Sequence, residues 1–81
     1  MKLRVRLFGD LRERAGWSER WLTGDQTTSP GLLWEAVAAE LGEPVTLPNR
    51  IRVAVNQQFA EPTAELCDGD EVAFLPPISG G

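Results

Sequence analysis

Residues 30–41 are the one long segment of the sequence with a helical repeat of apolar side chains. At about 100° per residue, one arc of this segment collects Leu33, Trp34, Val37, Ala38 and Leu41. Ser29-Pro30 suits a helix start, because serine caps free N–H groups and proline needs no donor at the first position. Gly42 is placed to end the helix. The segment predicts a single amphipathic helix that needs one apolar surface to cover it.

Alternating segments on both sides of this helix predict the covering surface. From Lys2 to Phe8, the residues Leu3, Val5 and Leu7 share one side of an extended strand. Further strands are expected at about 17–22, at 51–55, in a short return through Phe59, and at 71–75. A short helical turn is expected at 11–15, and the three tryptophans are expected in the core or at its rim.

A chain of 81 residues can bury only one core. The expected elements follow the order strand, strand, helix, strand, short strand, strand. Their apolar sides are most simply buried by packing the helix on one face of a mixed sheet. The ubiquitin-like β-grasp has this order, with its first and last strands side by side and parallel. We therefore expect an α+β protein with a β-grasp fold, as a single domain over residues 1–81 in which 76–81 form a flexible functional tail.

Composition argues against several classes of function. Twelve acidic and eight basic residues give a net charge of -4, which disfavours nucleic-acid binding. The charges are separated along the chain, with +3 over residues 1–24 and -7 over residues 25–81, a pattern suited to docking a protein partner. No apolar run reaches the roughly 18 residues that span a bilayer, and no secretion signal is visible. We expect a cytoplasmic protein without a membrane partner.

The residues that usually carry catalysis are missing. The chain has no histidine and a single cysteine, Cys67, so histidine catalysis and a thiolate zinc site are excluded and no metal is expected. No phosphate-binding loop or dinucleotide motif is present, so no cofactor is expected to bind this chain. Cys67 is expected to be a small packing residue. An autonomous enzyme is therefore the least favoured class.

The C-terminal residues have the properties of a delivery arm. They are Pro76, Pro77, Ile78, Ser79, Gly80 and Gly81. Glycines lack a Cβ, so their backbone can enter a narrow channel and leave the terminal carboxylate open to attack. The prolines hold the stem extended, and six residues reach up to roughly 20 Å. The pattern favours delivery of the Gly81 carboxylate into another protein's active site, and the alternative is an inert chain end.

Residues 68–81, with the sequence DGDEVAFLPPISGG, resemble the C-terminal signature of the molybdopterin synthase small subunit family, which are ubiquitin-like sulfur carriers. Residues 53–57 also resemble the central strand and turn of that family. The resemblance implies that an ATP-dependent, E1-like enzyme adenylates Gly81 and that a sulfur donor converts it to a thiocarboxylate. It further implies a hetero-oligomer with the large synthase subunit, in which sulfur passes to a cyclic pterin precursor to form the molybdopterin dithiolene.

Three other functions stay open at this point. A sulfur carrier of the thiamine pathway is also a β-grasp ending in glycines, although Pro76-Pro77 and the Ser79-Gly80-Gly81 ending resemble the molybdopterin family more closely. A protein modifier would be conjugated through Gly81 to lysines of other proteins, and Lys2 is the only lysine of this chain. A plain binding module would have a tail without chemistry.

Strand parity predicts a docking surface at the root of the tail. If alternate residues of the first strand face the helix, Phe8 lies on the open face of the sheet, and Leu75 of the last strand points outward beside it. Phe59 is the expected third member of this apolar patch, which a partner would grip. The alternative is that Phe8 is buried beneath the turn at 11–15. The candidates for charged docking are Arg4, Arg6 and Arg52, and the alternative is that they simply solvate an open sheet face or protect a sheet edge.

Overall fold

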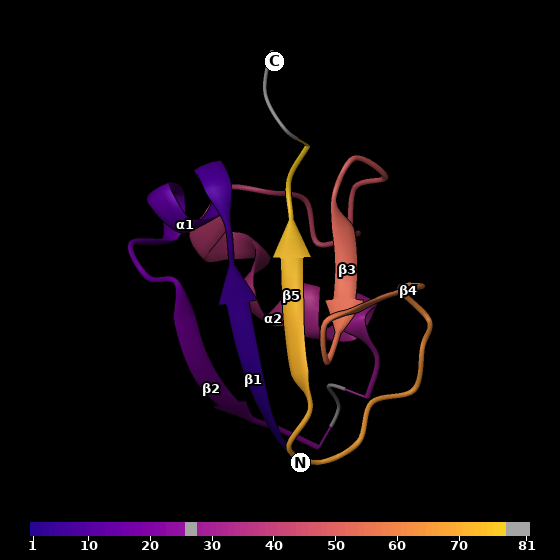
Figure 1. Ribbon diagram of the computed structural model, residues 1–81. Coiled ribbons are helices and arrows are strands. Elements are labelled where there is room, and N and C mark those ends of the chain that lie inside the picture. Colours follow the sequence, from indigo (N-terminus) through magenta and orange to yellow (C-terminus); the bar gives the residue numbers. More distant parts are fainter. Residues whose placement is uncertain (26–27, 78–81) are drawn as a thin grey trace.

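The computed structural model describes residues 1–25 and 28–77 of the chain. The elements are β1 (Lys2–Leu7), α1 (Gly9–Ala15), β2 (Glu19–Thr23), α2 (Pro30–Leu41), β3 (Arg52–Val55), β4 (Gln58–Ala60) and β5 (Glu71–Leu75). The strands form one mixed sheet in the order β2-β1-β5-β3-β4, and α2 lies against one of its faces (Figure 1). This arrangement confirms the predicted α+β, ubiquitin-like β-grasp fold.

The centre of the sheet is a parallel pair, β1 and β5, in which Leu7 is aligned with Phe74. The other three ladders are antiparallel. Neighbouring parallel strands end at the same edge of a sheet. The start of α1, which follows β1, therefore lies beside the chain that leaves β5 (Figure 1).

The core lies between the sheet and α2, and the predicted side chains form it. Leu3, Val5 and Leu7 of β1 are at most 1% exposed, and Val72 and Phe74 of β5 are fully buried. The predicted stripe of α2 is buried with them: Leu33, Trp34, Val37, Ala38 and Leu41. The rings of Trp34 and Phe74 meet edge to face, with centroids 5.1 Å apart. One core thus joins α2 to the two central strands.

The predicted ends of α2 are confirmed. The Ser29 hydroxyl accepts a hydrogen bond from the Leu32 backbone N–H at 3.3 Å, and Gly42 ends the helix with a φ of +66°. Other boundaries shift by one or two residues. The helix predicted at 11–15 already begins at Gly9, because Gly9 has a φ of +55° and turns the chain from β1 directly into α1. The second strand begins at Glu19 rather than near 17.

A buried carboxylate joins α1 to the segment that follows α2. The Glu43 side chain is 6% exposed and pairs with Arg14 at 2.8 Å and with Arg50 at 2.5 Å. Arg14 also donates to the Leu41 carbonyl at 2.7 Å. Burial by itself would raise the pKa of Glu43, but the hydrogen bonds and positive charges of the two arginines outweigh it and hold this pKa below its usual value. Glu43 therefore stabilises the fold in its ionised form.

We expect Glu43→Gln to lower the free energy of unfolding at pH 7 by about 1–2 kcal/mol, a value reduced because both arginines are more than a third exposed. The folded-state pKa lies below the ordinary 4.5, so this contribution is present above pH 4.5 and is lost as the pH falls through the folded-state value. Urea denaturation at a series of pH values should show the difference from wild type shrinking in that acidic range.

The matched control is Glu40→Gln. Glu40 also pairs with an arginine, Arg20, at 2.8 Å, but its side chain is 42% exposed. We expect this variant to lose less than about 0.5 kcal/mol. Equal losses in the two variants, or a loss for Glu43→Gln that does not depend on pH, would contradict the role given to Glu43.

Candidate functional site

The face of the sheet opposite α2 is not covered by a helix (Figure 1). The strand registers place two rows of side chains across this open face at the end where β5 leads into the tail. The first row, one residue beyond the last β1–β5 pair, holds Phe8, Leu75 and Arg52. The second row holds Arg6, Ala73, Ala54 and Phe59. Every residue of the predicted apolar patch therefore belongs to this face.

Phe8 continues the outward side of β1. Its backbone is still extended, with φ -129° and ψ 163°, although it is also the N-cap of α1. The Arg6 guanidinium lies 5.0 Å from the centroid of the Phe8 ring, which places both side chains on the open face. The alternative, burial of Phe8 beneath the 11–15 turn, is wrong because Leu11 fills that place in the core and is fully buried. Phe8 itself is half-buried.

Leu75 and Phe59 present more apolar surface on the same face. Leu75 is half-buried, and Phe59 is 70% exposed, the most exposed large apolar side chain in the part of the chain that the structure describes. Beside them in the second row, Ala54 and Ala73 carry small side chains that are 8% and 6% exposed. The structure thus places Phe8 beside Leu75 at the root of the tail, while Phe59 lies on the same face but two strands from β5, with Arg52 between them. Their binding to a partner stays a prediction.

The predicted charged residues separate into two groups. Arg4 pairs with Glu19 at 2.5 Å and with Glu71 at 3.6 Å, and Arg6 lies 3.9 Å from Glu19 and 3.8 Å from Glu71. The hydrogen bond from Arg4 lowers the pKa of Glu19 and raises that of Arg4, so this pair is ionised at neutral pH. Arg52 forms no ion pair with any carboxylate among residues 1–25 and 28–77. Of the carboxylates of Glu19 and Glu71, only that of Glu71 belongs to the acidic segment 25–81, so its pairs with Arg4 and Arg6 offset part of the charge separation along the sequence.

The root of the tail rests on α1. Pro76 is half-buried and Pro77 exposed, whereas the predicted tail residues Ile78, Ser79, Gly80 and Gly81 lie outside the described residues. A Cβ placed on Gly9 would lie 2.8 Å from Cγ of Pro76, so only glycine allows this close approach. No local pattern in the sequence gives Gly9 this role. The parallel pairing of β1 with β5 was the signal that could have predicted the contact.

Two exposed side chains differ from expectation. Trp21, expected in the core or at its rim, is 48% exposed, with the Lys2 ammonium 5.1 Å from its ring centroid. Cys67, expected to pack, is exposed. Within residues 1–25 and 28–77, no three metal-ligating side chains gather into a candidate metal site. In the same residues no helix has the length and apolar character needed to cross a membrane.

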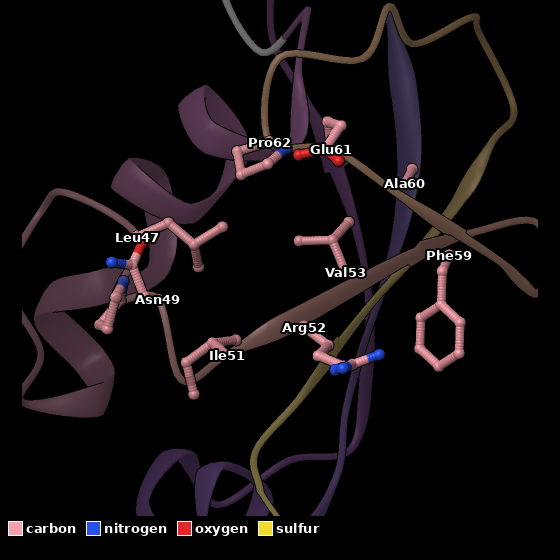
Figure 2. Close-up of a pocket in the computed structure, with 10 residues that line it drawn as sticks. Leu47, Asn49, Ile51, Arg52, Val53, Phe59, Ala60, Glu61 and Pro62 are labelled. Atoms are coloured by element: carbon pink, nitrogen blue, oxygen red, sulfur yellow. The ribbon is translucent and has the colours of Figure 1, made fainter.

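A cleft of about 420 Å³ lies beside the short edge strand β4, next to the open face. Figure 2 shows Leu47, Ile51 and Val53 along one part of its lining, with Arg52 and Phe59 together at another. Val53 and Arg52 project to opposite sides of β3 (Figure 2). The sequence contained no signal for this cleft, because its lining comes from β3, β4 and the loops on either side of them.

Comparison with known proteins identifies the family. The model of the ThiS family matches residues 5–81. The molybdopterin synthase sulfur carrier subunit of Chlamydomonas reinhardtii is 36% identical over 84 residues, covering 100% of both chains.

Solved structures share the fold over the whole chain. SAMP1 of Haloferax volcanii has a TM-score of 0.84 and 27% identity, with 100% of both chains covered. A chain from the complex of subunits 1 and 2 of molybdopterin-converting factor from Helicobacter pylori has a TM-score of 0.64 and 24% identity, again with 100% of both chains covered. With its β-grasp fold and a family match that reaches its final glycine, this chain belongs to the ThiS family.

Proposed function

We propose that this protein is the sulfur carrier subunit of molybdopterin synthase and that Gly81 is its reactive residue. The observation that carries the proposal is the apolar patch of Phe8, Leu75 and Phe59 at the root of a tail ending in two glycines. A full-length relative with 36% identity has this function in its name, which supports the proposal. The ThiS family match alone does not separate the molybdopterin and thiamine pathways.

The proposed chemistry begins at the Gly81 carboxylate. A carboxylate is a poor electrophile until one oxygen becomes part of a good leaving group. An E1-like partner would join a carboxylate oxygen to the adenylyl group of ATP, with pyrophosphate leaving. The terminal sulfur of a persulfide donor would then attack the carbonyl carbon and AMP would leave. A thiol would cleave the resulting acyl disulfide, forming a disulfide with the donor's remaining sulfur and leaving the thiocarboxylate on Gly81. In this scheme the carrier contributes its carboxylate, its slim tail and a docking face, and ATP is bound by the partner.

Sulfur transfer would take place in a complex with the large synthase subunit. A protein of the same fold occurs in the Helicobacter pylori complex of subunits 1 and 2, which supports a partner of this kind. The large subunit would hold the open face while Gly80 and Gly81 enter its active site. The thiocarboxylate sulfur would pass to a cyclic pterin precursor, and Gly81 would return to a carboxylate after hydrolysis.

We expect Gly81 to gain the mass difference between sulfur and oxygen when the protein is incubated with its activating enzyme, ATP and a sulfur source. Intact-protein and C-terminal peptide mass spectrometry would measure this change. The control is a variant that lacks Gly80 and Gly81, which should gain nothing and should keep its melting temperature, since terminal glycines contribute little packing. No gain in wild type, under conditions that modify an established carrier, would refute the proposal.

We expect Phe8→Ala and Leu75→Ala each to weaken binding to the large subunit by about 1–2 kcal/mol, because both remove apolar contacts at the root of the tail. Titration calorimetry would measure the affinities, and thermal melts would confirm that the variants fold. The matched control is Val45→Ala. Val45 is 62% exposed but lines a groove beside α2, away from the open face. Unchanged affinity in both patch variants would rule this docking face out.

We expect Gly9→Ala to slow sulfur transfer about tenfold within the complex, because the added methyl group displaces Pro76 and misaligns the tail. Gly16→Ala is the matched control: Gly16 also has positive φ, +82°, but a Cβ there meets no atom within 4 Å. Both variants should lose some stability from backbone strain. Single-turnover kinetics should show the transfer defect in Gly9→Ala alone, and equal rates in the two variants would contradict this role of Gly9.

A second candidate is a protein modifier joined through Gly81 to lysines of other proteins. The likeness to SAMP1 favours it, since a further Haloferax volcanii neighbour, with a TM-score of 0.79, is named small archaeal modifier protein 1. Isopeptide adducts that carry the C-terminal glycines in cells would support this candidate. A plain binding module, by contrast, would keep both binding and pathway activity after removal of Gly80 and Gly81.

A further inference from the structure

Arg52 differs from the other arginines of the open face because it has no acidic partner. Arg4 and Arg6 share Glu19 and Glu71 as partners. Arg52 is exposed, and it forms neither an ion pair nor a hydrogen bond through its side chain with residues 1–25 or 28–77. Among residues 1–25 and 28–77, Arg52 is therefore the unpaired cation of this face near the root of the tail, whereas Lys2, which also has no carboxylate partner, lies at the opposite end of β1 with its ammonium over Trp21.

Arg52 also lies close to the root of the tail. In the β3–β5 register it is aligned with Leu75, the residue before Pro76. Its guanidinium is 5.3 Å from the centroid of the Phe59 ring, and Figure 2 shows the two side chains next to each other. The ring restricts the guanidinium on one side, while its N–H groups have no described acceptor. An exposed aromatic ring and a guanidinium without an ion-pair partner in the described part of the chain thus lie side by side.

We propose that Arg52 is the charge-recognition residue of the docking face, and that the large subunit presents to it a carboxylate beside an apolar site for Phe59. The inference rests on the proposed function and adds to it the chemistry of the partner surface. A guanidinium binds a carboxylate through two parallel hydrogen bonds, and stacking on Phe59 lowers the entropy lost when they form. Arg4 and Arg6 would gain less, because Glu19 and Glu71 already neutralise them and repel an incoming carboxylate.

The net charge of the chain indicates that the contact between Arg52 and a carboxylate contributes to the orientation of the complex. At -4, the chain as a whole repels an acidic partner surface, so nonspecific attraction does not bring the two together. A carboxylate is attracted only where an unpaired cation meets it. Arg52 would therefore determine the orientation of the complex, aligning Leu75 and the tail with the partner's active site, while the apolar patch supplies most of the affinity.

The test measures binding of full-length variants to the large subunit at about 50 mM and about 500 mM salt, where screening differs strongly. At low salt we expect Arg52→Gln to raise Kd about five- to tenfold, mainly through slower association. Arg52→Lys should lie in between, because it keeps the charge but loses the planar fork. The control Arg20→Gln makes the same charge change on the helix side, where Arg20 pairs with Glu40, and should change Kd less than twofold.

Two further results are expected if Arg52 recognises a carboxylate. The increase in Kd caused by Arg52→Gln should shrink at high salt. It should also be smaller in a Phe59→Ala background, where the guanidinium loses its stacking partner. Wild-type affinity for Arg52→Gln at low salt, or an equal loss in Arg20→Gln, would overturn the inference while leaving the proposed function intact. Failure of the wild-type chain to bind the large subunit at all would instead overturn the proposed function, and this inference with it.

Discussion

The parallel pairing of β1 with β5 is the constraint on which the rest of the structure depends. Its register aligns Leu7 with Phe74, and both side chains are buried beneath α2. Because a strand alternates with a period of two, a slip of one residue would exchange the buried and open faces. The same register places Phe8 beside Leu75 on the outside and brings Gly9 against Pro76. The packing of the core thus determines the geometry at the root of the tail.

The open face has two chemically different parts, and this division follows from the same alternation. Away from the tail, Arg4 is held by Glu19 and Glu71, so that part of the uncovered face is charged. Towards the tail, Ala54 and Ala73 are too small to fill the face. The larger apolar side chain of Leu75, beside them on β5, is partly accessible to a partner. A partner that contacts Leu75 would therefore act on β5 itself.

Local signals account for what the sequence predicted well. The ends of α2 follow from Ser29, Pro30 and Gly42, whose effects act within one helical turn. The outer contacts could not be predicted in this way: Gly9 meets Pro76 across 67 positions of sequence, and Glu43 joins Arg14 across 29. Both contacts appear only after the strands pair. The proposed role of Gly81 rests on two things: the slim glycine and proline tail suits delivery of a carboxylate, and the segment resembles a family of sulfur carriers. The resemblance was needed because the local pattern alone leaves an inert chain end as an alternative.

Because Leu75 and Pro76 are adjacent, contact with a partner is linked to the direction in which the tail leaves the sheet. Leu75 belongs to the patch that a partner would contact, and the next residue rests against Gly9. A displacement of β5 on docking would therefore move Pro76 and Pro77. A small change in the direction of the chain at Pro76 would become a larger displacement at Gly81, in proportion to the distance between the two residues. The rigidity of the parallel pair is consequently a requirement of the proposed chemistry, since the partner can act on a carboxylate only where the sheet delivers it.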